Sequence, residues 1–170
     1  MKKIIFLLVC LSFLFIGCSA KNDQELQSMK NELLENIQKA MPEKVYNELK
    51  ENGHLSSDED NGEYIYLFGN KEQDPTLRLD FVYKDKTLIQ YRSKEYGFVD
   101  EMEDTVISKN DAIKLTQTFA KVFLDKDVSL SETSPYSGYE DENYVTFKDT
   151  ENNTYLVQLN RNMVIKFDIA

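Results

Sequence analysis

The chain has 170 residues, which suits one domain or two small ones, and it carries 30 acidic against 20 basic residues. The formal charge of −10 argues against a nucleic-acid partner, because phosphate binding needs a basic face that releases counterions. It also argues against electrostatic adsorption to anionic lipid, which needs clustered lysine and arginine. A hydrophobic content of 41% is enough for a packed core and argues against disorder along the whole chain.

The first 17 residues have the features of a cleaved export signal. Lys2 and Lys3 give a positive start, and residues 4–16 form an almost uninterrupted apolar run. A helix of that length spans roughly 20 Å, too short for a hydrocarbon core about 30 Å thick. The run therefore fits a signal peptide better than a membrane span.

The end of this run, Phe15-Ile16-Gly17-Cys18-Ser19, resembles the bacterial lipobox. The resemblance implies that the sulfur of Cys18 receives a diacylglycerol and that cleavage makes Cys18 the first mature residue. Residues 18–24 then form a short tether, and two or more acyl chains anchor a protein stably where one is marginal. The expected location is the outer face of a bacterial cell membrane. The alternative is an ordinary secretory signal with an incidental cysteine, and Cys18 in the mature chain has no partner for a disulfide.

The spacing of apolar residues predicts helices at two places. At the first place, an apolar stripe predicts a helix that ends in a kink at Pro42. A second short helix follows the kink and ends at Gly53. A clearer helix starts at Ser108, with Asp111 completing a weak capping box. The residues expected to face the core are Leu26, Met29, Leu33, Ile37, Ala40, Val45, Tyr46 and Leu49 in the first pair, and Ala112, Leu115, Phe119 and Val122 in the later helix, where Ile113, Ala120 and Phe123 widen the stripe. Phe119 is also expected to face Ile165 of a later strand across the interface between helix and sheet.

Two sets of β-rich segments follow these helices. The first set is expected at 63–68, 77–83 and 87–92, and the second at 144–148, 154–159 and 163–169, with a short irregular strand at 128–130. The polar, acidic stretch 54–62 is expected to be a loop.

The two sets resemble each other. Similar strand sequences recur at offsets of 80, 78 and 76 residues, which suggests an internal duplication, with chance similarity between strand-rich stretches as the alternative. The sequence thus predicts an α+β fold of two similar units, each a helix packed on a three-stranded antiparallel meander. The expected boundaries are 25–93 for the first unit, 94–107 for a connector and 108–170 for the second unit.

The second unit resembles the PepSY-like modules of exported bacterial proteins. The resemblance lies in Ile107-Ser108-Lys109-Asn110-Asp111-Ala112-Ile113 at the helix start and in residues 154–167 at the terminal hairpin. The order of helix and meander is also similar to that of the small cystatin-like lipoproteins of Gram-positive bacteria. Both resemblances imply extracytoplasmic binding or inhibition of a protein, not catalysis, and neither supplies a site residue beyond Cys18.

The candidates for other chemistry are few. His54 is the only histidine, and no GxSxG motif accompanies it, although a Ser-His-Asp set assembled in space is not excluded by spacing. Residues 57–62 superficially resemble a calcium loop, but Phe68 falls where the bidentate glutamate is needed. The acidic clusters 100–104 and 140–142 are expected to be solvated loops, with weak calcium binding or a carboxylate pair for glycoside hydrolysis as alternatives. We therefore expect no catalytic residue, no metal and no cofactor.

Two function classes remain after these exclusions. The first is a non-enzymatic lipoprotein that binds or inhibits another envelope or extracellular protein, with tyrosines such as Tyr136 and Tyr139 in an exposed patch. The second is a lipoprotein that binds a small ligand or peptide in a cleft between its two units. A surface hydrolase ranks last, because a small chain with one histidine offers few candidate groups.

Overall fold

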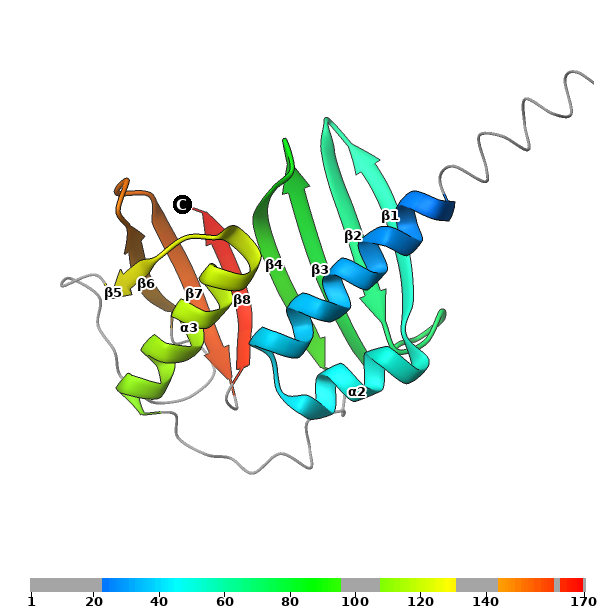
Figure 1. Cartoon of the computed structure of the whole chain (residues 1–170), viewed down its shortest axis with the longest axis horizontal. Helices are drawn as coiled ribbons and strands as arrows, with labels where there is room; N and C mark the ends of the chain where they lie inside the picture. Colours follow the sequence, from blue (N-terminus) through cyan, green and yellow to red (C-terminus); the bar gives the residue numbers. More distant parts are fainter. Residues whose placement is uncertain (1–22, 96–107, 131–143, 161–162, 170) are drawn as a thin grey trace, which may run out of the picture. The chain divides into compact units, whose positions relative to one another are not determined.

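The computed structural model describes residues 23–95, 108–130, 144–160 and 163–169. The predicted signal, the lipidation site and residues 18–22 of the predicted tether lie outside these ranges, whereas residues 23–24 belong to the first helix. The chain divides into two compact units, Met1–Leu33 and Leu34–Ala170. The eight strands of the described residues and the helices α2 and α3 belong to the second unit (Figure 1).

Three helices are present in the described residues, in the places where the sequence predicts them. The first covers residues 23–40, and the break at residues 41–42 separates it from α2 (Glu43–Asn52). Pro42 stands at the N-cap of α2, where its missing N–H costs nothing. Helix α3 (Lys109–Leu124) begins at the predicted cap, since the Ser108 hydroxyl oxygen accepts from the backbone N–H of Asp111 at 3.2 Å.

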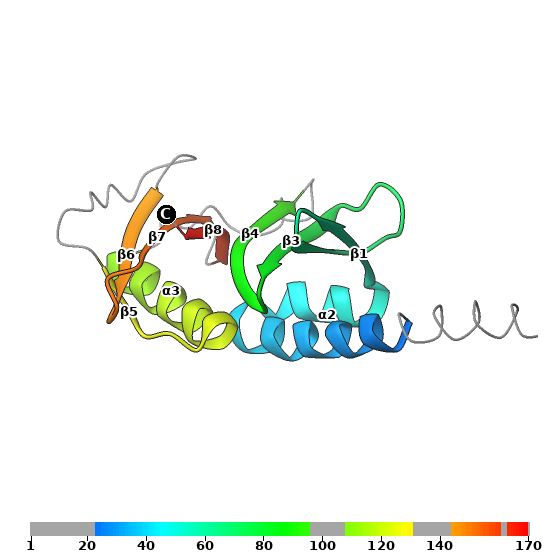
Figure 2. The same cartoon turned by 90° about the horizontal axis from the view of Figure 1, so that it is seen from above.

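The strands form one antiparallel sheet in the order β1-β2-β3-β4-β8-β7-β6-β5. Helices α2 and α3 lie on the same face of this sheet (Figure 2). The fold is therefore α+β, as predicted. The strand bounds are His54–Asp60 for β1, Glu63–Gly69 for β2, Leu77–Lys84 for β3, Thr87–Glu95 for β4, Val128–Leu130 for β5, Tyr144–Asp149 for β6, Thr154–Asn160 for β7 and Met163–Ile169 for β8.

The finer prediction, two similar units that each consist of a helix on a three-stranded meander, is not confirmed. Strand β4 pairs with β8, which places Tyr91 opposite Phe167 and joins both sets of strands in one sheet. The stretch 54–62 is also not a loop: β1 pairs with β2 along its whole length. The acidic composition of β1 is explained by its position, because an edge strand with one partner leaves most of its side chains in water. Asn61 and Gly62, both at positive φ, form the two-residue turn between β1 and β2.

The core between the sheet and α3 is aromatic at the place where β4 meets β8. The Phe119 ring lies 5.0 Å from Tyr91 of β4 and 5.2 Å from Phe167 of β8, measured between ring centroids. Phe123, one turn further along α3, lies 4.6 Å from Phe119. All four rings are buried, so the hydrophobic core continues across the junction of the two sets of strands.

Some details of the predicted core of the second unit are wrong. Leu115 and Val122 are half-buried, and the buried side of α3 consists of Ala112, Thr116, Phe119, Ala120 and Phe123. The prediction is therefore correct for Ala112, Phe119, Ala120 and Phe123, and it missed Thr116. On β8, Ile165 is half-buried, and the ring that contacts Phe119 belongs to Phe167.

Candidate functional site

Most of the residues singled out in the sequence lie outside the described ranges. These are Cys18, the acidic clusters 100–104 and 140–142, and the tyrosines Tyr136 and Tyr139. His54 is described: it begins β1 opposite Gly69, with its side chain exposed. Ser57 and Glu59 lie further along β1, in the strand that replaces the loop they were expected to form.

Two features are absent from the described part of the chain, a metal-binding cluster and a membrane-spanning helix. No group of three or more His, Cys, Asp or Glu side chains is placed there to hold a metal ion. The described helices all fall short of the length and hydropathy that a transmembrane segment requires.

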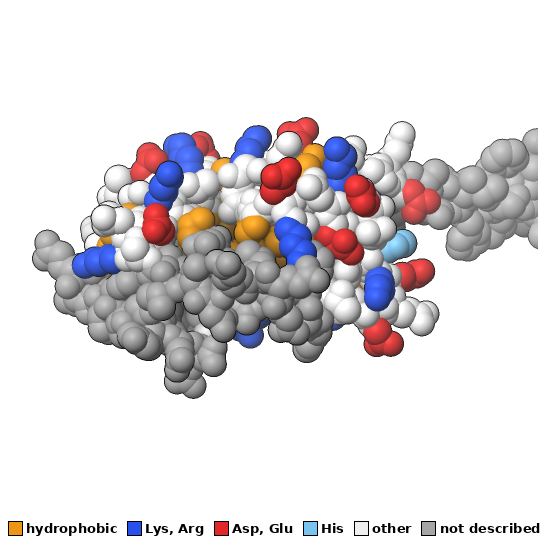
Figure 3. Space-filling view, turned by 90° about the horizontal axis from the view of Figure 1, so that it is seen from below, with side chains coloured by type: hydrophobic (Ala, Val, Ile, Leu, Met, Phe, Trp, Pro, Cys, Tyr) orange, Lys and Arg blue, Asp and Glu red, His pale blue; other side chains and the backbone are white. Residues whose placement is uncertain are grey.

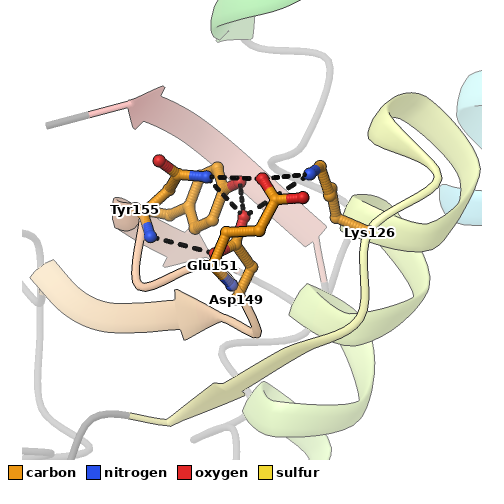
Figure 4. Close-up of polar contacts among 5 residues, drawn as sticks. Lys126, Asp149, Glu151 and Tyr155 are labelled. Atoms are coloured by element: carbon orange, nitrogen blue, oxygen red, sulfur yellow. Dashed lines mark hydrogen bonds and ion pairs between the residues drawn. The ribbon is translucent and has the colours of Figure 1, made fainter.

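The most concentrated polar cluster surrounds Asp149, the last residue of β6 (Figure 4). Asp149 Oδ1 accepts from the backbone N–H groups of Glu151 and Asn153, both at 2.9 Å. Asp149 Oδ2 accepts from the Asn153 amide and from the Tyr155 hydroxyl, both at 2.8 Å. Lys126 Nζ lies 3.9 Å from the same oxygen and 2.8 Å from a Glu151 carboxylate oxygen. Four residues from the β6–β7 hairpin and the segment after α3 thus converge on the carboxylate of Asp149.

These contacts change the acidity of both buried partners. Burial of Asp149 opposes its ionisation, but the hydrogen bonds from Asn153, Tyr155 and Glu151 outweigh burial and lower the pKa of Asp149 to about 2. For Tyr155, burial and then the hydrogen bond to Asp149 raise the pKa above its ordinary value of 10.0. Asp149 is therefore ionised, and Tyr155 protonated, throughout the physiological range.

The geometry of the cluster suits a structural role better than a chemical one. Both oxygens of Asp149 already accept two hydrogen bonds each, and its side chain has no exposed surface. A general base needs a lone pair that can reach a substrate proton, which this carboxylate does not offer. Asp149 instead holds the turn at residues 150–153 by replacing backbone acceptors, as aspartate often does in turns.

A groove of about 470 Å³ runs beside α3 and β5, and is lined by Gln117, Thr118, Lys121, Val122, Asp127 and Val128. Its polar side chains have partners within the protein. Gln117 donates to the Val128 carbonyl at 3.0 Å, and Thr118 donates to the Lys114 carbonyl at 2.9 Å. Lys121 pairs with Asp125 at 3.0 Å and with Asp127 at 3.6 Å. The groove therefore offers a ligand few groups that lack a partner.

The sheet face opposite α2 and α3, called the outer face below, is a second candidate. Side chains alternate between the two faces along each strand, so the residues that alternate in sequence with the buried core residues lie on the outer face. Its apolar members are half-buried: Ile65 and Leu67 on β2, Val82 on β3 and Leu156 on β7. Its charged members in the middle of the sheet are Arg78 and Asp80 on β3, Arg92 and Lys94 on β4, and Lys166 and Asp168 on β8.

The charges in the middle of the outer face do not balance. Asp80 lies within 2.7 Å of Arg78 and 3.3 Å of Lys94, and Lys166 lies 3.1 Å from Asp168. Arg92 is exposed and has no hydrogen-bond or ion-pair partner within the described chain. Asp168 Oδ1 is buried and accepts no hydrogen bond there.

Sequence reasoning missed this central group because it depends on register. The alternation of Arg78 and Asp80 with buried leucines was visible in the sequence, as was that of Lys166 with Ile165 and Phe167. No local signal shows that β4 and β8, which are far apart in the chain, lie side by side. Elsewhere the surface is mixed: acidic and basic side chains are interspersed over the described residues seen from below (Figure 3).

Comparisons of this chain with protein-family models, with curated proteins and with solved structures found no match.

Proposed function

We propose that this chain is a bacterial lipoprotein, held at the outer face of the cell membrane by a lipid on Cys18, and that its folded part binds or inhibits another envelope or extracellular protein without catalysis. The N-terminal pattern of Lys2, Lys3, the apolar run and Gly17-Cys18 supports the anchor. The outer face of the sheet supports the binding role and is the observation that carries it.

That face combines apolar and charged side chains on one surface. It is continuous across the junction of β4 and β8, and it places half-buried apolar side chains such as Leu67, Val82 and Leu156 on either side of charged ones. Interfaces between proteins combine apolar contact with polar groups that fix orientation. The alternative is a small-ligand or peptide-binding lipoprotein with a cleft between the predicted units 25–93 and 108–170. The groove described above does not support it, because that groove lies within residues 117–128 and its polar groups are satisfied internally.

The duplicated origin of the fold is also part of this proposal. Each half is a helix followed by a meander of four strands, β1–β4 with α2 and β5–β8 with α3. The order of strands from the edge of the sheet to its centre is the same in both halves. The offsets of 80, 78 and 76 residues between similar strand sequences agree with this arrangement.

The anchor is tested by producing the full chain and its Cys18→Ala variant in a bacterial host and separating membranes from medium. The wild-type chain should be recovered in the membrane fraction with a mass that fits acylation, and the variant should stay uncleaved or appear in the medium. A mature variant that remains in the membrane fraction would contradict the proposal. Binding is tested by chemical crosslinking in intact producing cells, where one discrete protein adduct is expected and its absence would contradict a protein partner.

A further inference from the structure

The centre of the outer face places two positive charges directly opposite each other. Arg92 on β4 is the register partner of Lys166 on β8. Like charges at directly opposed positions of neighbouring strands destabilise a sheet, because their side chains start only about 5 Å apart. This pair lies where β4 meets β8 in the middle of the eight strands.

The neighbouring carboxylates do not neutralise the positive charge of Arg92, because each of them pairs with another cation. Asp80, its register partner on β3, is within ion-pair distance of both Arg78 and Lys94. Asp168 pairs with Lys166, and Arg92 itself has no partner within the described chain. Four cations and two carboxylates thus share the centre of the outer face, in a chain whose formal charge is −10.

We infer, on the basis of the proposed function, that the outer face binds an acidic segment of the partner protein, with a carboxylate of that segment lying between Arg92 and Lys166. A carboxylate at this point neutralises the surplus charge and gives Arg92 a planar acceptor that suits its guanidinium group. The half-buried apolar side chains on both sides, Val82 on β3 and Leu156 on β7, then contact apolar side chains of the same segment.

A protein segment fits this face better than an anionic membrane surface does. Lipid headgroups satisfy the cations but leave Val82, Leu156 and Ile65 against a polar layer. The net negative charge of the chain also opposes its adsorption to an anionic bilayer. An anionic membrane surface is therefore the less favoured occupant, and a lipid adduct in the test below would reveal it.

The test places a photo-crosslinking amino acid in the full chain, produced in cells with its own signal. One variant carries it at Gln90, which lies on the outer face two residues from Arg92, and the control carries it at Lys114, which is exposed on α3. A protein adduct is expected at position 90 and not at position 114. Adding Arg92→Gln should reduce that adduct by roughly tenfold or more, the loss expected when one partner of an interface charge pair is removed. Arg92→Lys keeps the charge but not the planar guanidinium group, so it should reduce the adduct less than Arg92→Gln does.

A matched control tests whether the loss of adduct is specific to the charge of Arg92. Lys84→Gln removes one positive charge from the exposed end of β3, away from the Arg92–Lys166 pair, and should leave the adduct unchanged. Arg92 is exposed, so its variants are expected to fold, and melting curves of the purified full chain confirm this before the adducts are compared. Mass spectrometry of the adduct should place the crosslink in an acidic segment of the partner.

The remaining outcomes separate this inference from the proposed function. An adduct at position 90 that is insensitive to Arg92→Gln, or that maps to a segment without acidic residues, overturns the inference and leaves a protein partner. A lipid adduct at position 90 replaces the protein segment by an anionic membrane surface. An adduct only at position 114 moves the binding surface to the helical side, and no protein adduct at either position contradicts both proposals.

Discussion

Tyr155 donates its hydroxyl to Asp149 Oδ2 over 2.8 Å, and this bond joins the end of β6 to the start of β7. Tyr155 is buried on the helical face, where its ring lies 5.1 Å from that of Phe167. The same side chain therefore belongs both to the hydrophobic core and to the polar turn. We expect the β6–β7 hairpin to depend on this residue more than on any single apolar contact at its edge.

Tyr155→Phe should lower the free energy of unfolding by about 1.5–3 kcal/mol, because it removes a hydrogen bond to an ionised, buried acceptor. Urea unfolding followed by circular dichroism measures this difference. Tyr64→Phe is the matched control, since Tyr64 is 46% exposed, and should change stability by no more than about 0.5 kcal/mol. Equal effects of the two substitutions would show that the Tyr155 hydroxyl contributes nothing to the fold.

The carboxylate of Asp149 should make stability depend on pH in the acid range. Its pKa is about 2 in the folded chain, below the ordinary 3.8, so the ionised form stabilises the fold. That contribution is complete above the ordinary pKa and is lost as the pH falls through about 2. The difference in urea midpoint between the wild type and Asp149→Asn should be largest near about pH 6 and shrink towards pH 2. A difference that is constant over this range would mean that Asp149 has an ordinary pKa.

Asn70 connects the loop after β2 to helix α2. Its amide donates to Glu48 at 2.8 Å and to Thr76 at 2.9 Å, and its oxygen accepts from the Leu77 backbone N–H at 3.1 Å. Asn70→Ala should lower the free energy of unfolding by about 1–3 kcal/mol, because it leaves a buried N–H without an acceptor. Gln73→Ala, in the exposed part of the same loop, should have an effect below about 0.5 kcal/mol in the same urea titration. Comparable losses at both positions would contradict this role.

Thr116 places a hydroxyl in the core of α3 that has no partner among the described residues. Thr116→Val keeps the shape of the side chain and removes the cost of burying that hydroxyl, so stability should rise by about 1 kcal/mol. The control is Thr118→Val on the same helix, where the hydroxyl donates to the Lys114 carbonyl and its removal should give no gain. A lower melting temperature for Thr116→Val would indicate that the hydroxyl does have a partner.

The local features of the fold were largely predictable from the sequence, because they depend on short-range chemistry. Ser108 caps α3, Pro42 separates the first two helices, and the alternation from Met163 to Ile169 forms a strand. The error at β1 had a signal that could have prevented it: Asn61-Gly62 is a strong indicator of a tight hairpin, and it outweighs an acidic composition at a sheet edge.

The pairing of β4 with β8, in contrast, was not predictable from local patterns. It depends on residues such as Tyr91 and Phe167, which are separated by most of the second half of the chain. The central charges of the outer face are visible one strand at a time, but their imbalance exists only once Arg92 and Lys166 are opposed. The candidate site on the outer face therefore depends on strand register. The lipidation of Cys18 depends on the sequence alone and stays a prediction.

The junction between β4 and β8 gives the last prediction. Phe119→Ala should lower the free energy of unfolding by about 3–5 kcal/mol, because it removes the buried ring that contacts both Tyr91 and Phe167. Lys114→Ala, exposed on the same helix, should cost no more than about 0.5 kcal/mol.

A double-mutant cycle then tests the contact across the core itself. The combined loss for Phe119→Ala and Phe167→Ala should be smaller than the sum of the single losses by about 0.5–1.5 kcal/mol, because each substitution removes the same ring contact. Ile165→Ala should cost less than Phe167→Ala, since Ile165 is only half-buried. Additive losses would mean that α3 does not pack on β8 through these rings. The pairing of β4 with β8 would then have to be stabilised by other contacts.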